Sequence, residues 1–304
     1  MTATKGVFFG KLITTLLILL CPVIKGCKSF TPSTSTNLKS SSHTETVGSS
    51  HLNMGGYQST AGTDPSSPLQ FFILPNKACP YAQRTHITLI ELNIDFSLNE
   101  VTLTPTKPDW YLKINPRGKV PAIRIPKFDN QVVYESAICD EFLCDFSRTT
   151  LQNDHDLMPT DPMLRSKIRL CNDHCDNVFA KTQFTFLMNK DDDKDQELKN
   201  DMENALLYYE DLLTQNGGGP YLFGENFTIA DVHIIPFIQR LVVTMRYFKN
   251  YELPSEKFPN FLNWIEACSE RESVKNTILS EEDMINNYKR FFEMNYKFGG
   301  LNKN

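Results

Sequence analysis

The sequence predicts an α/β domain at residues 69–148, followed by an all-helical domain at residues 153–300. Short apolar runs of strand length alternate with helical spacing over the first range. From residue 162 onward the apolar spacing is helical only, and an Asn-Gly-Gly-Gly-Pro stretch at 216–220 separates two of the helices. A cysteine, Cys79, stands where the first strand turns into the first helix.

The elements of the first domain follow from its turn and breaker residues. We expect strands at 69–74, 95–103, 120–125 and 131–134, and helices at 79–92, from 108 to about 114, and from 135–136 onward. Pro80 suits a first helical position, because the N–H that it lacks would have no partner there. Pro121 cannot donate to a sheet ladder, so it must lie at the edge or start of a strand. Phe-Asp-Asn at 128–130 predicts a hairpin turn.

The second domain is expected to contain five long helices. Their predicted ranges are about 162–188, 195–215, 228–248, 258–271 and 281–293. Asp161 is a good N-cap and Pro162 a good first residue for the first of them. Thr228 and Asp231 form a variant of the capping box with Asp in the third position, which has a role in folding.

Composition excludes several classes of protein. The chain has 304 residues, 40% of them hydrophobic and 22% charged, which is ordinary for a globular protein. Its net charge of -5 provides no basic footprint for nucleic acid. The eight cysteines are too few for a disulfide scaffold and follow no zinc spacing, so we predict free thiols and no metal.

The N-terminal segment precedes both domains. Residues 1–28 resemble a signal or anchor-like leader. Lys5 and Lys11 make its start basic, and an apolar run extends from Leu12 to Ile24. That run is too short to span ~30 Å of hydrocarbon comfortably, so a membrane role is expected only if the leader is retained. Residues 29–68 are rich in Ser and Thr and are predicted to be disordered. They are either a plain tether or the second half of an organelle-targeting leader.

Cys79 is the candidate nucleophile. With Pro80 as the first helical residue, Cys79 becomes the N-cap, and the N–H groups of Tyr81 and Ala82 are free to point at its sulfur. The positive end of the helix dipole favours a thiolate, so we expect a pKa below the free value of about 8.5. Position 82 is Ala, so no second cysteine can resolve a disulfide internally. The resolving thiol must then come from solution, unless Cys79 is an inert buried cysteine.

A second candidate site lies where Glu135 and Ser136 open a helix. Ser136 offers a hydroxyl and a backbone N–H to a carboxylate, and Glu135 can meet an ammonium group. An α-amino acid end of a ligand would satisfy both, whereas a simple helix cap is the alternative.

Other reactive residues are better explained by packing. Cys171 and Cys175 share a helical face and could pair on a metal, but no second ligand pair follows, so we expect small apolar packing. Cys139 and Cys144 are interpreted as structural, and His233 is expected to lie in the core or to be partly exposed.

Four motifs of the first domain resemble those of omega-class glutathione transferases in order and spacing, and two stretches of the second domain resemble that family's helical domain. The six are Cys79-Pro80-Tyr81-Ala82-Gln83-Arg84, Lys107-Pro108-Asp109-Trp110, Asn115-Pro116-Arg117-Gly118-Lys119-Val120-Pro121, Tyr134-Glu135-Ser136-Ala137-Ile138, Thr228–Asp231 and Phe258-Pro259-Asn260-Phe261-Leu262-Asn263-Trp264. The likeness extends from about residue 69 to about 290. It implies a thioredoxin-like domain followed by an all-α helical domain, usually as a homodimer.

The resemblance also implies a role for each matching residue. Cys79 would be the nucleophile that forms a mixed disulfide with glutathione, which serves as a cosubstrate. The glutathione-binding residues and their implied partners are Tyr81 beside the thiol, Lys107 at the glycyl carboxylate, Val120 with Pro121 in cis at the cysteinyl backbone, and Glu135 with Ser136 at the γ-glutamyl end. Trp264 would line the acceptor pocket.

We therefore expect a glutathione-dependent thiol transferase and dehydroascorbate reductase, with roles in detoxification and redox homeostasis. A reductive dehalogenase or etherase on the same scaffold is an alternative. So is a redox-regulated binding or membrane-associated protein similar to the chloride intracellular channel proteins. The leader indicates the secretory pathway or an organelle, whereas the family resemblance implies the cytoplasm.

Overall fold

The computed structural model describes residues 66–103, 106–153 and 155–296. These residues belong to one compact unit, 55–304, and the other unit, 1–54, lies outside the described residues. The predicted leader at 1–28 and nearly all of the predicted linker at 29–68 also lie outside the described residues. Among the described residues, none of the helices combines the length and the apolar character that crossing a membrane requires.

The α/β domain is built on a four-stranded sheet with the order β2-β1-β3-β4. Its strands are β1 (Leu69–Ile73), β2 (Phe96–Glu100), β3 (Ala122–Ile125) and β4 (Gln131–Tyr134). β1 pairs with β2 in parallel and with β3 antiparallel, and β3 and β4 form the predicted hairpin. β1 is buried along almost its whole length because it is a central strand, which explains its apolar sequence.

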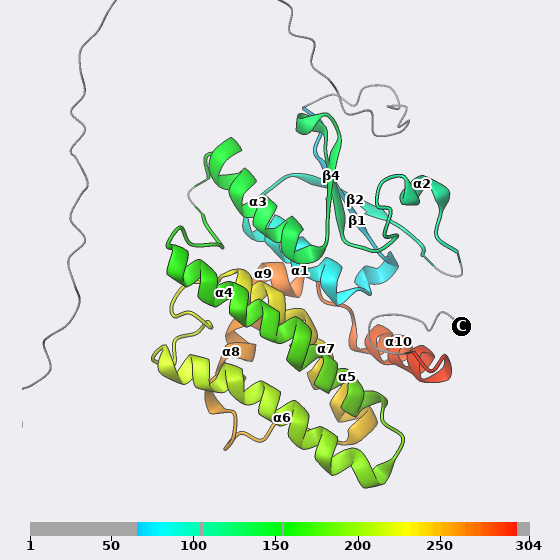
Figure 1. Ribbon diagram of the computed structural model, residues 1–304, viewed down its shortest axis with the longest axis vertical. Helices are drawn as coiled ribbons and strands as arrows, with labels where there is room; N and C mark the ends of the chain where they lie inside the picture. The colour runs from blue at the N-terminus through cyan, green and yellow to red at the C-terminus, as the bar shows by residue number, and fades with distance from the viewer. Residues whose placement is uncertain (1–65, 104–105, 154, 297–304) are drawn as a thin grey trace, which may run out of the picture. The chain divides into compact units, whose positions relative to one another are not determined.

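Three helices complete this domain. They are α1 (Pro80–Glu91), α2 (Asp109–Leu112) and α3 (Ser136–Thr150). α1 packs directly against α3, and α2 lies on the opposite side of the sheet from α3 (Figure 1). A single turn of 3₁₀-helix, Pro75–Lys77, separates β1 from α1, where the sequence predicted a break.

In the described part of the second domain the regular elements are helices, and one isolated antiparallel bridge joins Tyr221 and Gly224. The helices are α4 (Pro162–His174), α5 (Ala180–Met188), α6 (Asp192–Gln215), α7 (Ile229–Lys249), α8 (Pro259–Ser269), α9 (Glu272–Lys275) and α10 (Glu281–Glu293). The predicted single helix at 162–188 is wrong in one respect, because a π-helical turn at Cys175–Phe179 separates α4 from α5. The short helix α9 was not predicted. The overall prediction of an α/β domain followed by an all-helical domain is confirmed.

α7 joins the two domains. Nearly every residue of its first four turns is buried, and it packs against α1 as well as α4, α5 and α10. Its Gln239 accepts a hydrogen bond from Gln83 of α1 at 2.8 Å, and Arg240 donates one to Gln83 at 2.7 Å. The helix that follows Cys79 is therefore held against the helical domain by buried polar contacts as well as by apolar packing.

Candidate active site

Cys79 occupies the predicted place at the N-terminus of α1. It is the N-cap residue, with extended backbone angles and Pro80 directly after it. Its thiol donates to the carbonyl oxygen of Val120, with 3.8 Å between Sγ and O. Of the cysteines among the described residues, Cys79 is partly exposed and the other five are buried. Only this thiol, within the described part of the chain, is therefore open to a ligand.

The expected low pKa of Cys79 is wrong for the ligand-free protein. Burial raises the pKa of this thiol above its ordinary value, although the N–H groups of Ala82 and Tyr81 and the positive charges of Arg240 and Arg84 oppose the shift. The predicted N–H groups do point at the sulfur, but desolvation outweighs them. The site consequently stabilises a thiolate as it forms, while holding mostly thiol at neutral pH.

The Val120–Pro121 peptide bond is cis, as the resemblance implied. Pro121 lies directly before β3, which agrees with its predicted place at the start of a strand. Tyr111 and Asn115 both hold the preceding carbonyl, that of Lys119, each donating at 2.7 Å. The backbone beside the Cys79 sulfur is thus fixed by buried side chains.

Glu135 and Ser136 open α3 as predicted. Glu135 is the N-cap and has a φ of 72°, which is uncommon for a residue with a side chain and is often found at ligand sites. Its carboxylate accepts a hydrogen bond from Arg117 at 2.7 Å; the Arg117 side chain is exposed and that of Glu135 is partly exposed. Ser136 is buried, and its Oγ accepts from Nη1 of Arg84 at 3.2 Å.

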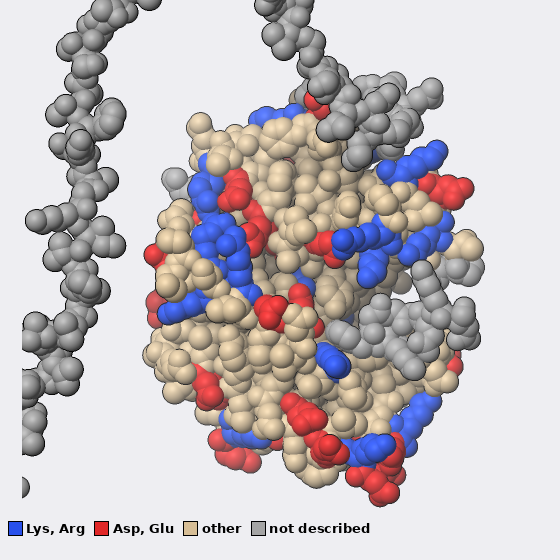
Figure 2. Space-filling view, in the orientation of Figure 1, with Lys and Arg blue, Asp and Glu red and all other residues tan. Residues whose placement is uncertain are grey.

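Lys107 lies among other basic residues. The segment 107–119 also carries Lys113, Arg117 and Lys119, and all four side chains are exposed. Figure 2 shows basic side chains gathered on the surface around α2. Nζ of Lys107 donates to the carbonyl of Arg117 at 3.2 Å. This surface has the charge that a carboxylate-bearing ligand requires.

Tyr81 lies at the start of α1. Its ring packs edge-on against Phe237 of α7, with 5.1 Å between the ring centroids. Burial raises the pKa of Tyr81 to about 12, so its hydroxyl is neutral and can donate a hydrogen bond.

Trp264 does not line an acceptor pocket, so that prediction is wrong. Its side chain is fully buried in α8, where it stacks on Phe261 with 5.1 Å between centroids. Its Nε1 donates to Oδ1 of Asp231 at 2.8 Å. The indole therefore belongs to the core of the helical domain, where an acceptor has no access to it.

A buried polar cluster at the domain interface was not predicted. Arg84 is 1% exposed, and its Nη2 donates to Oδ1 of Asp176 at 2.7 Å. Nε2 of His233 lies 3.1 Å from the other oxygen of Asp176. Of the two predicted positions for His233, in the core or partly exposed, the structure shows the core. The side chain lies next to a carboxylate there. Only tertiary packing brings these three residues together.

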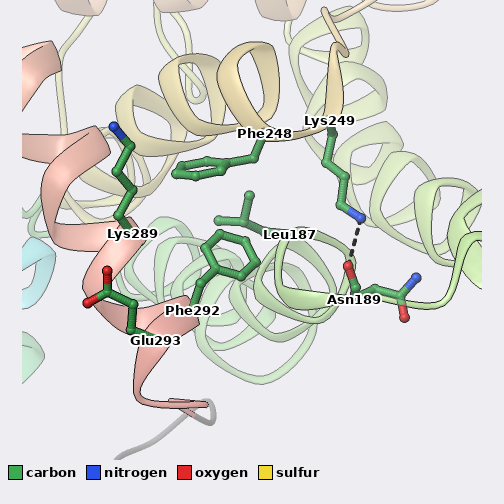
Figure 3. A pocket seen from close by; sticks show the side chains of 7 residues that line it. All are labelled: Leu187, Asn189, Phe248, Lys249, Lys289, Phe292 and Glu293. Atoms are coloured by element: carbon green, nitrogen blue, oxygen red, sulfur yellow. Dashed lines mark hydrogen bonds between the residues drawn. The ribbon is translucent and has the colours of Figure 1, made fainter.

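A cavity of about 320 Å³ lies elsewhere, between the ends of α5, α7 and α10 (Figure 3). It is lined by Leu187, Asn189, Phe248, Lys249, Lys289, Phe292 and Glu293. Nζ of Lys249 donates to the carbonyl of Asn189 at 3.0 Å across its rim. None of the predicted glutathione residues contributes to this cavity.

Comparison with known families covers both domains. Residues 78–145 match the family model of the glutathione S-transferase N-terminal domain, and residues 177–277 match that of the glutathione S-transferase C-terminal domain. Together the two models span more than half of the chain.

Individual relatives agree with these matches. The chain is 27% identical over 228 residues to "Glutathione S-transferase DHAR3, chloroplastic" of Arabidopsis thaliana, covering 72% of this chain and 79% of the relative. It is 29% identical over 217 residues to "Probable glutathione S-transferase DHAR1, cytosolic" of Oryza sativa subsp. japonica, covering 68% and 87%. Among solved structures, glutathione transferase Omega 3C from Trametes versicolor has 28% identity and a TM-score of 0.64, covering 75% of this chain and 91% of that one. The chain belongs to the glutathione transferase family, in its cysteine-type, omega-like group.

Proposed function

We propose that this protein is a glutathione-dependent thiol transferase that also reduces dehydroascorbate. The observation that carries the proposal is the single partly exposed thiol of the described residues, Cys79, placed at the start of α1 beside the Val120 carbonyl. The relatives named DHAR, an abbreviation of dehydroascorbate reductase, support the choice of acceptor.

The proposed thiol transfer has two steps. The Cys79 thiolate attacks the glutathionyl sulfur of a mixed disulfide, forming a Cys79–glutathione disulfide and releasing the acceptor as a thiolate that takes up a proton. A second glutathione, as its thiolate, then attacks the glutathionyl sulfur and yields glutathione disulfide and free Cys79. The N–H groups of Tyr81 and Ala82 stabilise the thiolate in both steps.

Dehydroascorbate would follow the same route with two glutathione molecules. The Cys79 thiolate adds to a carbonyl carbon, and glutathione attacks the bound sulfur, so that the electron pair of the C–S bond leaves with ascorbate. The product on the enzyme is again the Cys79–glutathione disulfide. One glutathione disulfide forms for each ascorbate, which balances the two electrons.

We propose that the glutathione site is composed of the residues that the resemblance assigned. Lys107 would pair with the glycyl carboxylate within the basic surface around α2, and Val120 with Pro121 would hold the cysteinyl backbone. Glu135 and Ser136 would hold the γ-glutamyl end, where the strained N-cap already presents both groups. Tyr81 would lie beside the thiol at the glutathione site.

We also propose a homodimer, as the family resemblance implies. Three large apolar side chains are exposed on α3 and α4, namely Ile138 at 59%, Met163 at 65% and Leu170 at 65%. Met163 and Leu170 are seven residues apart, so they share one face of α4. A Leu170→Glu variant should shift the oligomer toward monomer in sedimentation analysis.

The compartment depends on the segment that precedes the described residues. Relatives of this chain carry both chloroplastic and cytosolic names, so the family occurs in an organelle as well as in the cytosol. We propose that residues 1–28 direct the chain into the secretory pathway or an organelle. Mass spectrometry of the mature N-terminus tests this, and an intact N-terminus in cytosolic fractions would contradict it.

The activity is tested with the full chain, glutathione, and either a small disulfide or dehydroascorbate. We expect Cys79→Ser to abolish both reactions. Cys268→Ala is the matched control, because that thiol is fully buried in α8 and should leave turnover unchanged. Full turnover by Cys79→Ser would refute the assignment, and absence of turnover in the unaltered protein would favour a binding protein similar to the chloride intracellular channel proteins.

A further inference from the structure

A positively charged stretch borders the proposed glutathione site. Residues 107–119 carry four basic residues, Lys107, Lys113, Arg117 and Lys119, and one acidic residue, Asp109. The stretch therefore has a charge of +3, although the whole chain has a net charge of -5. A positive surface on a negative protein attracts anionic partners to that place in preference to the rest of the molecule.

Most of this positive charge is not neutralised within the protein. Arg117 pairs with Glu135, with 2.7 Å between Nη1 and Oε1. The side chains of Lys107, Lys113 and Lys119 are exposed and form no ion pair with another described residue. Lys107 is already assigned to the glycyl carboxylate of glutathione, so the charges of Lys113 and Lys119 are left without a role.

Lys119 places one of these charges next to the thiol. It directly precedes Val120, whose carbonyl oxygen lies 3.8 Å from the Cys79 sulfur. Two buried side chains hold the Lys119 carbonyl, each donating to it at 2.7 Å, so the backbone there has a fixed position. A protein joined to glutathione through a disulfide would present the residues around its modified cysteine to this edge of the site.

An exposed aromatic ring lies within the same surface. Trp110 of α2 is 50% exposed, although its ring contacts those of Tyr111 and Phe72 at centroid distances of 5.7 Å and 6.4 Å. Lys113, three residues later, lies on the same side of α2. Tryptophan is enriched among the residues that contribute most to binding at protein–protein interfaces. Trp110, Lys113 and Lys119, here called the acceptor surface, thus combine an apolar anchor with positive charge.

We propose that the acceptor surface binds glutathionylated proteins whose modified cysteine lies among acidic residues, and that these are the preferred substrates of thiol transfer. This inference rests on the proposed function, because it requires Cys79 to exchange disulfides. The Cys79 thiolate attacks the glutathionyl sulfur, and the disulfide between glutathione and the protein breaks. The Cys79–glutathione disulfide forms, and the protein leaves as a thiolate that takes up a proton.

The position of the acceptor surface favours a protein partner over an anionic membrane. A membrane would meet the same lysines and the same tryptophan. However, a lipid headgroup brings no disulfide to Cys79, whereas a glutathionylated protein brings one and can place its acidic residues against Lys119 in the same encounter. The charge then raises the rate of productive encounter, which is the usual effect of electrostatic complementarity.

The test compares three substrates with the full chain. Each is a mixed disulfide of glutathione with a short synthetic peptide whose single cysteine is flanked by acidic, neutral or basic residues. The glutathionyl group is common to all three, so any effect on glutathione binding cancels in the ratios of kcat/KM. At about 0.1 M ionic strength we expect kcat/KM for the acidic peptide to exceed that for the basic peptide about tenfold. At about 1 M the ratio should fall below about twofold, because the Debye length shrinks from about 10 Å to about 3 Å.

Two charge reversals at the two ends of β3 form a matched pair. Lys119 precedes this strand and Lys127 follows it, and both side chains are exposed without an ion pair to another described residue. Lys119→Glu should lower the ratio of acidic to basic peptide at least about threefold at about 0.1 M ionic strength. Lys127→Glu changes the net charge equally but should change the ratio less than about twofold, because β3 separates it from the thiol by more than a Debye length of about 10 Å.

The outcomes separate this inference from the proposed function. Equal kcat/KM for the three peptides in the unaltered protein would overturn the inference, as would equal effects of the two reversals. The salt dependence of the unaltered protein provides the test if Lys119→Glu does not fold, and a ratio that salt leaves unchanged would overturn it. Binding to phosphatidylserine vesicles without a preference among the peptides would assign the surface to a membrane instead. If the unaltered protein reduces neither the peptides nor the mixed disulfide of glutathione with mercaptoethanol, the proposed function itself fails.

Discussion

Replacing Asp231 with alanine should strongly destabilise the helical domain. Its Oδ1 accepts from the backbone N–H of Leu222 at 2.9 Å and from Nε1 of Trp264 at 2.8 Å. Its Oδ2 accepts from the N–H of Thr228 at 2.8 Å and from the Thr228 hydroxyl at 2.9 Å. The side chain of Asp231 is fully buried, so its four hydrogen bonds are shielded from bulk water.

The expected magnitude follows from these donors. Asp231→Ala leaves three N–H groups buried without a partner, and each costs about 1–3 kcal/mol. One of the three is the N–H of Thr228, the N-cap of α7, so this sum already includes the loss of the capping box, and we expect a total of at least about 3 kcal/mol. That is a large part of the roughly 5–15 kcal/mol that stabilises an ordinary domain.

Equilibrium urea denaturation of the purified variant measures this loss. Trp264→Phe is the informative comparison, because it removes one donor, and it should cost about 1–3 kcal/mol. Since the indole is buried, this variant should leave the KM for the acceptor unchanged. A loss below about 1 kcal/mol for Asp231→Ala, or a raised acceptor KM for Trp264→Phe, would refute the reasoning.

Three other predictions concern charge and space. Burial raises the pKa of Asp140 from 3.8 to about 7 in the folded state, so its ionisation destabilises the fold as pH rises. The free energy of unfolding of Asp140→Asn, measured relative to the unaltered protein, should therefore be about 3 kcal/mol more favourable at pH 8 than at pH 5. Denaturation of both proteins at the two pH values measures this difference. Because the pKa of Cys79 is raised, its alkylation by iodoacetamide should quicken about tenfold per pH unit between pH 6 and 8, and a plateau below pH 7 would contradict this. Gly118 has a φ of 56°, and a Cβ there would collide with the Lys107 side chain, so Gly118→Ala should raise the KM for glutathione, as steady-state kinetics would show.

Local signals in the sequence predicted most of the fold. The strand-to-helix turn at Cys79, the proline that starts α1 and the glycine-rich stop after α6 are short-range features, and the structure confirms each of them. The α/β order followed by helices is likewise a matter of periodicity. The π-helical turn at Cys175–Phe179 has no such signal, because the apolar spacing continues across it.

Features that depend on tertiary packing could not be predicted in the same way. Arg84 and Asp176 are 92 positions apart, and nothing near either residue indicates that they meet. The direction of the Cys79 pKa depends on how far packing excludes water, which outweighs the helix N-terminus. Trp264 was assigned from its position in a motif, but burial in α8 decides its role.

The central claim is that Cys79 forms the mixed disulfide with glutathione. The most direct test treats the full chain with glutathione disulfide, digests it without reductant and maps the glutathionyl adduct by mass spectrometry. The account predicts an adduct on the peptide that contains Cys79, and its release by glutathione at a rate at least equal to turnover. An unmodified Cys79 peptide, or an adduct that glutathione releases more slowly than turnover, would contradict it.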